Sequence, residues 1–209
     1  MPPSTTVDYA ESYLPEDPVL SAARQRATEV GVVPIGSGGG AALRLLAAAV
    51  AARSVVELGT GTGVSGVWLL RGMHPEGVLT TIDPEAEHQR LAREAFTEAG
   101  FATARARTIN GRALEVLPRL ADSSYDLVFC DAVKTEYADY LPEAIRLLRP
   151  GGIVAFDNAL WHGKVPDAAA RDPETVALRE LGRLVRDNDR LVSALLPVGD
   201  GLLVAVLRD

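Results

Sequence analysis

The sequence predicts a single α/β domain whose doubly wound, mostly parallel sheet of seven strands ends in an antiparallel hairpin. Short apolar runs alternate with helical stretches from residue 54 to about residue 187, as in parallel strands joined by right-handed crossovers. The last two apolar runs are separated only by residues 197–201, too few for a helix, so they form a hairpin. A length of 209 residues suits one such domain.

The predicted elements follow in order along the chain. Residues 1–34 read as a polar, proline-containing extension with one helix at 18–30, and residues 35–209 as the main domain. The glycine run at 36–40 opens a helix that reaches about residue 52. Strands are expected at 54–58, 78–82, 104–109, 125–130, 152–157, 190–196 and 202–207, and helices at 64–73, 84–99, 111–120, 136–148 and 171–187.

Composition narrows the class of protein. The net charge of −7 argues against nucleic acid as the main partner. The single cysteine, Cys130, excludes an intramolecular disulfide and suits a reducing compartment. The first ten residues lack the pattern of a signal peptide, and the most apolar helical stretch, 41–52, is too short to span a bilayer. We therefore expect a cytoplasmic protein with no membrane partner.

Oxygen-bearing side chains follow two of the predicted strands. Asp131 ends the strand at 125–130, and Asp157 and Asn158 end the next one. Because ligands of open α/β sheets bind at the carboxyl ends of the strands, these side chains should lie near one another at such a site. Two carboxylates and an amide oxygen suit Mg²⁺ or Ca²⁺. Lys134, three residues past Asp131, is a base within reach of that site.

A glycine-rich loop joins the first core strand to its helix. Its pattern Gly61-x-Gly63-x-x-Gly66 satisfies the dinucleotide fingerprint, and Asp83, at the end of the second strand, can accept both hydroxyls of a ribose. Glu57 would repel a pyrophosphate, which favours the phosphate-free cofactor S-adenosylmethionine (SAM). The alternative is that Glu57 only caps backbone N–H groups of the loop.

These residues give the chain a family resemblance that runs from about residue 18 to the C-terminus. The glycine loop makes the chain resemble class I SAM-dependent methyltransferases, which have a Rossmann-like fold. More narrowly it is similar to the cation-dependent O-methyltransferases that include catechol and caffeoyl-coenzyme A O-methyltransferases. The narrower likeness is carried by Asp131, Lys134, Asp157, Asn158 and the stretch Leu160-Trp161-x-Gly163-x-Val165.

The resemblance implies a role for each matching residue. It places at the cofactor Ile35, Glu57, Gly59, Thr60, Gly61, Ser65, Asp83, Arg112, Ala113 and Asp131. It makes Asp131, Asp157 and Asn158 the ligands of a divalent cation, with Mg²⁺ expected and Mn²⁺ or Ca²⁺ as alternatives. Lys134 becomes the general base, and Tyr137 and Trp161 border a small-molecule substrate. It further implies a homodimer, a methyltransferase domain at 35–209 and an extension at 1–34 that could cover the substrate.

Two other functions are consistent with parts of the sequence. A nicotinamide-dependent oxidoreductase would use the same glycine loop, but no Tyr-x-x-x-Lys pair is present. A non-catalytic cofactor-binding protein would tolerate losses in the metal and base positions, yet all four are filled.

The chain departs from the family pattern at Val133, where Asp or Trp is common, and at Gly40-Ala41, where Gly-Gln is usual. The choice of substrate therefore stays open.

The remaining conspicuous side chains have simpler interpretations. Trp68 and Cys130 are expected in the core. His74 and His88 are expected on the surface. His162 borders the expected substrate pocket and is a candidate for substrate contact.

Overall fold

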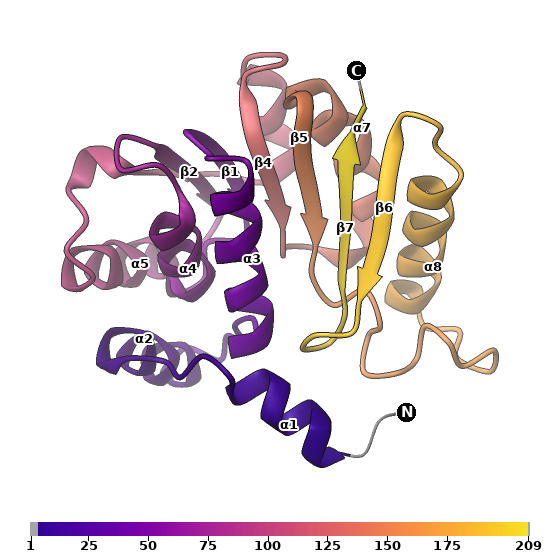
Figure 1. The fold of residues 1–209 in the computed structure, drawn as a ribbon, viewed down its shortest axis with the longest axis horizontal. Helices are drawn as coiled ribbons and strands as arrows, with labels where there is room; N and C mark the ends of the chain where they lie inside the picture. Colours follow the sequence, from indigo (N-terminus) through magenta and orange to yellow (C-terminus); the bar gives the residue numbers. More distant parts are fainter. Residues whose placement is uncertain (1–3, 209) are drawn as a thin grey trace.

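Seven strands form one sheet in the order β3-β2-β1-β4-β5-β7-β6 in the computed structural model, which describes residues 4–208 (Figure 1). Strands β1 to β5 pair in parallel, whereas β7 is antiparallel to both β5 and β6. The predicted sheet and its C-terminal hairpin are confirmed. The strands are β1 Ser54–Leu58, β2 Val78–Asp83, β3 Ala106–Asn110, β4 Tyr125–Cys130, β5 Leu148–Phe156, β6 Leu191–Leu196 and β7 Leu202–Leu207.

Helices cover both faces of the sheet. They are α1 Ser4–Ser12, α2 Pro18–Glu29, α3 Ser37–Ala49, α4 Val64–Gly72, α5 Ala86–Glu98, α6 Ala113–Val116, α7 Tyr137–Leu147 and α8 Pro173–Arg186. Successive strand residues enter different cores: Val55 packs with α2 to α5, and Val56 packs with α6 to α8. This two-sided burial explains why the central strands read as continuous apolar runs. Trp68 and Cys130 are buried, as predicted.

Strand β5 begins at Leu148 and not at residue 152 as predicted, and two helical regions also differ from the prediction. The helix expected at 111–120 is only the four-residue α6, followed by a 3₁₀ turn at Leu117–Arg119. Pro118 lies in that turn and has no N–H to continue the α-helical pattern. The extension contains a second helix, α1, besides the predicted α2. Residues 1–3 of the extension lie outside the described residues.

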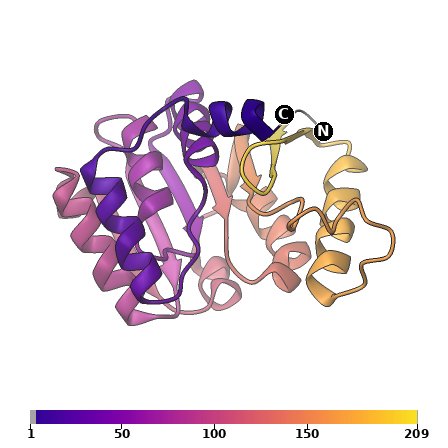
Figure 2. The ribbon, with the colours of Figure 1, turned by 90° about the horizontal axis from the view of Figure 1, so that it is seen from below.

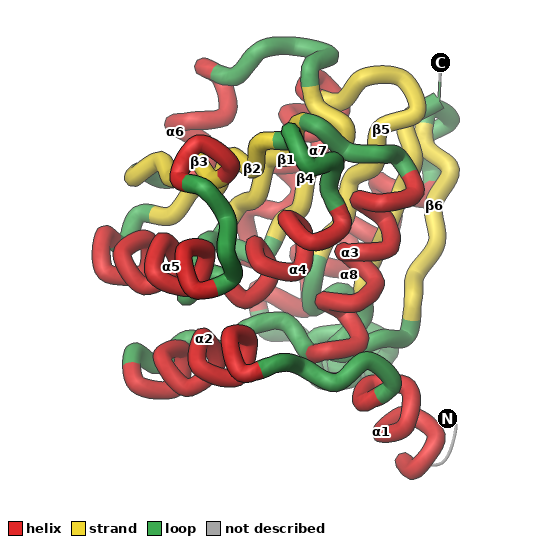
Figure 3. Tube along the Cα trace, turned by 60° about the vertical axis from the view of Figure 1, so that its left-hand side comes forward, coloured by secondary structure: helices red, strands yellow, loops and turns green. Residues whose placement is uncertain are grey.

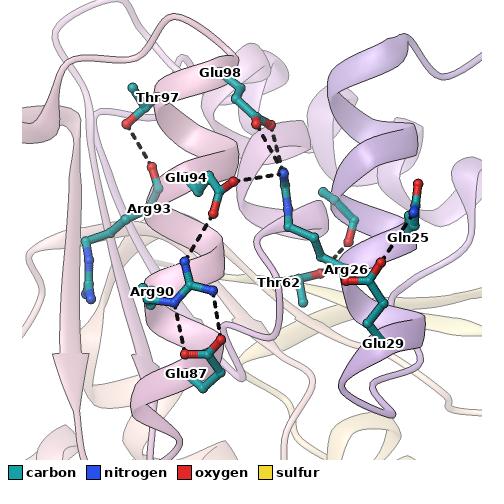
Figure 4. A network of polar contacts seen from close by, with 11 residues as sticks. Gln25, Arg26, Glu29, Thr62, Glu87, Arg90, Arg93, Glu94, Thr97 and Glu98 are labelled. Carbon is teal, nitrogen blue, oxygen red and sulfur yellow. Dashed lines mark hydrogen bonds and ion pairs between the residues drawn. The ribbon is translucent and has the colours of Figure 1, made fainter.

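Helix α2 lies against α5 of the main domain (Figures 2 and 3), where polar contacts hold it. Arg26 forms ion pairs with Glu98 at 2.7 Å and Glu94 at 3.4 Å on α5 (Figure 4). The Thr62 hydroxyl, in the glycine loop, donates to the Ala23 carbonyl at 2.8 Å. Because α2 is fixed at both places, the segment that follows it, residues 30–36, is held beside the glycine loop.

No helix within residues 4–208 combines the length and the apolar character that crossing a membrane requires.

Candidate active site

A cavity of about 720 Å³ opens at the carboxyl ends of the parallel strands. This is where an open α/β sheet binds its ligands. The cavity brings together most of the predicted site residues on its wall: Ile35, Gly59, Thr60, Gly61, Ser65, Asp83, Arg112, Ala113, Asp131, Lys134, Asn158 and Trp161. Three predicted residues, Glu57, Tyr137 and Asp157, lie behind that wall and are buried.

The glycine loop begins where β1 meets the end of β4. Gly59 has φ +93°, and its N–H donates to the Ile82 carbonyl at 2.9 Å. A Cβ at this position would lie 2.1 Å from the Asp131 carbonyl oxygen. Gly59 is therefore required both by its backbone conformation and by the close approach of the strand that carries Asp131.

Replacing Gly59 by alanine should abolish binding of SAM, the cofactor that the resemblance implies, and lower the free energy of unfolding by about 2–3 kcal/mol. The matched control is Gly100→Ala, because Gly100 has φ +82° but no atom within 4 Å of its added Cβ. That variant should lose only about 1–2 kcal/mol to backbone strain and should bind SAM normally. Chemical denaturation and calorimetry measure both quantities. Equal behaviour of the two variants would refute the steric argument.

Asp83 is held in place by the backbone. Its Oδ2 accepts from the Gly61 N–H at 3.0 Å, and its Oδ1 accepts from the Glu85 N–H at 2.8 Å. Contrary to the prediction of a surface residue, His88 lines the cavity with Nδ1 3.3 Å from Asp83 Oδ1. The first turn of α5 turns His88 back toward the strand end. The fixed carboxylate suits two ribose hydroxyls.

Glu57 supports the loop from behind. It is fully buried, and its two carboxylate oxygens accept from the hydroxyls of Ser65 and Thr81, each at 2.6 Å. The Thr81 hydroxyl also contacts that of Thr60 at 2.7 Å. Burial raises the pKa of Glu57 from 4.5 to about 7, although both hydrogen bonds act in the opposite direction. Glu57 thus bonds to hydroxyl groups, rather than capping backbone N–H groups.

The raised pKa of Glu57 predicts a pH dependence of stability. The folded protein holds this proton between pH 4.5 and about 7 while the unfolded chain releases it, so stability falls as pH rises through that range. The effect is up to roughly 3 kcal/mol. Glu57→Gln should remove this part of the dependence and be the more stable form at pH 7.5. Urea unfolding of both proteins at pH 5 and pH 7.5 measures it; parallel pH profiles would contradict the prediction.

Lys134 is anchored at the cavity wall by two side chains. Its Nζ donates to Asp131 Oδ1 at 2.6 Å and to the Tyr137 hydroxyl at 2.8 Å. That hydroxyl in turn donates to the Cys130 carbonyl at 3.0 Å. The structure thus places Tyr137 in the core, where it orients Lys134, instead of beside the substrate as predicted. Burial raises the pKa of Tyr137 well above 10, so it stays a neutral phenol.

The tyrosine one helical turn further on, Tyr140, does line the cavity. Its hydroxyl donates to Glu136 Oε2 at 2.7 Å. Glu136 Oε1 forms an ion pair with Arg112 at 2.7 Å. Neither Tyr140 nor Glu136 was predicted from the sequence. Together the three side chains form one hydrogen-bonded chain along the part of the wall where the resemblance implies the adenine.

The two acidic strand ends meet as predicted. Cys130 pairs with Phe156 in the β4–β5 ladder, which sets Asp131 beside Asp157. Burial raises the pKa of Asp157 from 3.8 to about 7, and the negative charge of Asp131 adds to the rise. Among residues 4–208, no side chain donates a hydrogen bond to the Asp157 carboxylate. Within the same residues, no three His, Cys, Asp or Glu side chains gather as a metal-binding group.

The loop after β5 carries the rest of the wall. Asn158, Trp161 and His162 all line the cavity and have positive φ angles of 58°, 47° and 54°. The Trp161 indole donates to Asp172 Oδ1 at 3.1 Å and lies 5.1 Å from the His162 ring. Such backbone conformations are uncommon outside glycine and cluster at functional sites. His162 therefore lies on the cavity wall, and its contact with a substrate stays a prediction.

The chain matches the O-methyltransferase family over residues 10–208. A protein of Mycobacterium tuberculosis named a probable O-methyltransferase is 52% identical over 198 residues, which cover 95% of this chain and 88% of that protein. One similar solved structure is that of the O-methyltransferase TomG from Streptomyces achromogenes, which is involved in tomaymycin synthesis and was solved in complex with SAM. Its sequence is 30% identical to this chain, the TM-score is 0.88, and the match covers 99% of this chain and 96% of that one.

A third similar structure is an O-methyltransferase of Bacillus cereus in complex with SAH. It is 27% identical with a TM-score of 0.87, covering 98% of this chain and 97% of that one. Fold, cavity and these likenesses define a SAM-dependent methyltransferase of Rossmann-like fold. The chain belongs to the O-methyltransferase family and is a SAM-dependent O-methyltransferase. The family assignment decides against the nicotinamide-dependent and non-catalytic alternatives.

Proposed function

We propose that this enzyme methylates one of two adjacent hydroxyls on a small catechol-like substrate, with a divalent cation held by Asp131, Asp157 and Asn158. The observation that carries the proposal is the placement of Asp131, Asn158 and Lys134 on the cavity wall, with Asp157 buried behind that wall next to Asp131.

The donor set fits a hard cation. Asp157 is buried, has its pKa raised by burial and by Asp131, and receives no hydrogen bond from another side chain of residues 4–208. A positive charge between the two carboxylates would relieve their repulsion. Oxygen ligands of this kind suit Mg²⁺, Mn²⁺ or Ca²⁺. When bound, such an ion supplies Lewis acidity that lowers the pKa of a hydroxyl on it.

Lys134 would take the proton of the reacting hydroxyl at Nζ. Two of its three donor positions are held by Asp131 and Tyr137, which leaves one for the cavity. As the neutral amine, Lys134 can accept a proton from a hydroxyl within hydrogen-bond reach. Asp83, Ser65 and the glycine loop would hold SAM so that its methyl group lies in line with the oxygen, and this alignment is a large part of the rate gain.

The partners and the location are also proposals. The substrate is a small molecule, in keeping with a cavity of about 720 Å³ that has Trp161 and Val133 on its wall. We further propose a homodimer in the cytoplasm with neither nucleic acid nor membrane as partner, in keeping with the net charge of −7 and the family resemblance.

Positional isomers of a diphenol test the proposal. With labelled SAM and Mg²⁺, catechol should accept the methyl group, whereas resorcinol, whose hydroxyls are not adjacent, should react at least about a hundredfold more slowly. Both compounds have the same atoms and similar acidity, so only chelation geometry separates them. Equal rates on the two isomers would remove the adjacent-oxygen requirement, and the family activity would then need another substrate class.

A further inference from the structure

We propose that Asp200 is a positioning residue that turns the amide oxygen of Asn158 toward the cation site. Asp200 lies in the turn between β6 and β7, outside the cavity wall, whereas Asn158 lies on the wall. The inference rests on the proposed cation site and adds a residue that the family match assigns no role.

The β6–β7 turn is fixed against the loop that carries Asn158. The N–H of Leu160 donates to the Asp200 carbonyl at 2.8 Å, and the N–H of Ala159 donates to the Gly201 carbonyl at 2.9 Å. Gly201 has φ +87°, and a Cβ there would lie 2.6 Å from Leu160 Cγ. The two segments therefore approach too closely for a side chain, and the Asp200 backbone has a fixed place beside Asn158.

The carboxylate of Asp200 accepts hydrogen bonds from this same loop. Its Oδ1 accepts from the His162 N–H at 2.6 Å, and its Oδ2 accepts from Asn158 Nδ2 at 3.4 Å. The His162 ring Nδ1 also lies 3.4 Å from Oδ2. The strong bond to the His162 backbone sets the carboxylate, and the longer contact reaches the amide.

Chemistry then decides which end of the amide faces the cavity. The oxygen and nitrogen of an asparagine amide have nearly the same shape, so packing alone cannot orient them. An ionised carboxylate only accepts hydrogen bonds, so the Asn158 NH₂ group must face Asp200. The amide oxygen then points away from Asp200, and only this oxygen can ligate a hard cation. Without Asp200, either end could face the site.

Asp200 could also act simply through its charge, because its negative charge contributes to the raised pKa of Asp157. The two explanations separate when residue 158 is itself a carboxylate. Either oxygen of an aspartate can ligate a cation, so an aspartate at this position needs no orientation. A pure charge effect, in contrast, persists whichever residue stands there.

Calorimetry of Mn²⁺ binding to the SAM-free protein provides the test. Four proteins are compared: wild type, D200N, N158D and N158D/D200N. Asp200→Asn keeps the shape and an oxygen for the His162 N–H, yet it can also donate to the Asn158 oxygen and so permits the flipped amide. SAM affinity reports an intact fold when D200N is compared with wild type and N158D/D200N with N158D, because each comparison changes only Asp200, which does not line the cavity.

We expect D200N to weaken Mn²⁺ binding about tenfold with SAM affinity unchanged. In the N158D background the same change should leave the Mn²⁺ affinity unchanged or raise it, because it removes the repulsion between two neighbouring carboxylates. An unchanged Mn²⁺ affinity in D200N overturns the proposal. An equal loss of Mn²⁺ affinity from the Asp200→Asn change in both backgrounds also overturns it, and so does the absence of Mn²⁺ binding in both N158D and N158D/D200N. If the wild type itself binds no Mn²⁺, the proposed cation site fails, and the role of Asp200 fails with it.

Discussion

Replacing Lys134 by methionine is expected to lower the turnover number about 10²–10⁴-fold while the affinity for SAM stays unchanged. Methionine keeps much of the length and apolar stem of lysine but cannot accept a proton at the position of Nζ. Lys134 is at the wall of the cavity, yet none of its hydrogen bonds supports the glycine loop or Asp83. Steady-state kinetics with catechol and calorimetry with SAM measure the two quantities separately.

The chain supplies a matched control, because it contains only one other lysine. Lys164 is half exposed, pairs with Asp172 at 3.5 Å and does not line the cavity. Lys164→Met should therefore leave turnover close to that of the wild type. Unchanged turnover in Lys134→Met would remove it as the base, and an equal loss in both variants would point to a general effect of lost charge.

Replacing Asp157 by asparagine is expected to lower Mg²⁺-dependent turnover by at least about a hundredfold, since it removes a charged ligand worth several kcal/mol. The folded protein should not be destabilised by this change. Burial and Asp131 make the charged form of Asp157 unfavourable, so a neutral isostere relieves that cost. Kinetics over a range of Mg²⁺ concentrations and thermal unfolding without metal measure the two effects.

Asp139→Asn is the control for this variant, because Asp139 is an exposed residue on α7. It should change neither turnover nor stability. Full Mg²⁺-dependent activity in Asp157→Asn would show that the buried carboxylate holds no ion. A large loss of stability in the same variant would instead show that Asp157 supports the fold in its charged form.

The sheet could be predicted from the sequence because its signals are local. The central strands β1 and β4 and the second half of β5 are buried on both faces and read as mostly apolar runs, and the five residues between the last two strands allow only a hairpin. Helix lengths depend on finer features. The break after α6 follows from Pro118, which the periodicity of 111–120 concealed. Helix α1 lacks an apolar stripe and is held by tertiary contacts, as Glu11 accepts from the N–H groups of Gly38 and Gly199.

The site was predictable where it depends on strand ends. Asp83, Asp131 and Asn158 follow strands whose carboxyl ends meet at one edge, so a linear pattern is enough to place them on the cavity. Side-chain direction was not predictable in the same way. Tyr137 and Tyr140 are three residues apart on one helix face and both are buried, and only the packing of α7 decides which one also borders the cavity.

Two further residues show why contacts across the fold escape sequence analysis. His88 reaches Asp83 only because the first turn of α5 folds back over the end of β2. Glu57 points beneath the loop because the hydroxyls of Ser65 and Thr81 satisfy its carboxylate there. No spacing in the sequence distinguishes His88 from an exposed helix residue. In the same way, none distinguishes Glu57 from a residue that binds the cofactor directly.

The most direct measurement of the central claim is methyl transfer from SAM to catechol after treatment with EDTA. If Asp131, Asp157 and Asn158 hold the cation that activates the hydroxyl, the chelated enzyme should bind SAM but transfer no methyl group, and added Mg²⁺ should restore the full rate. Full activity in excess EDTA would contradict the account.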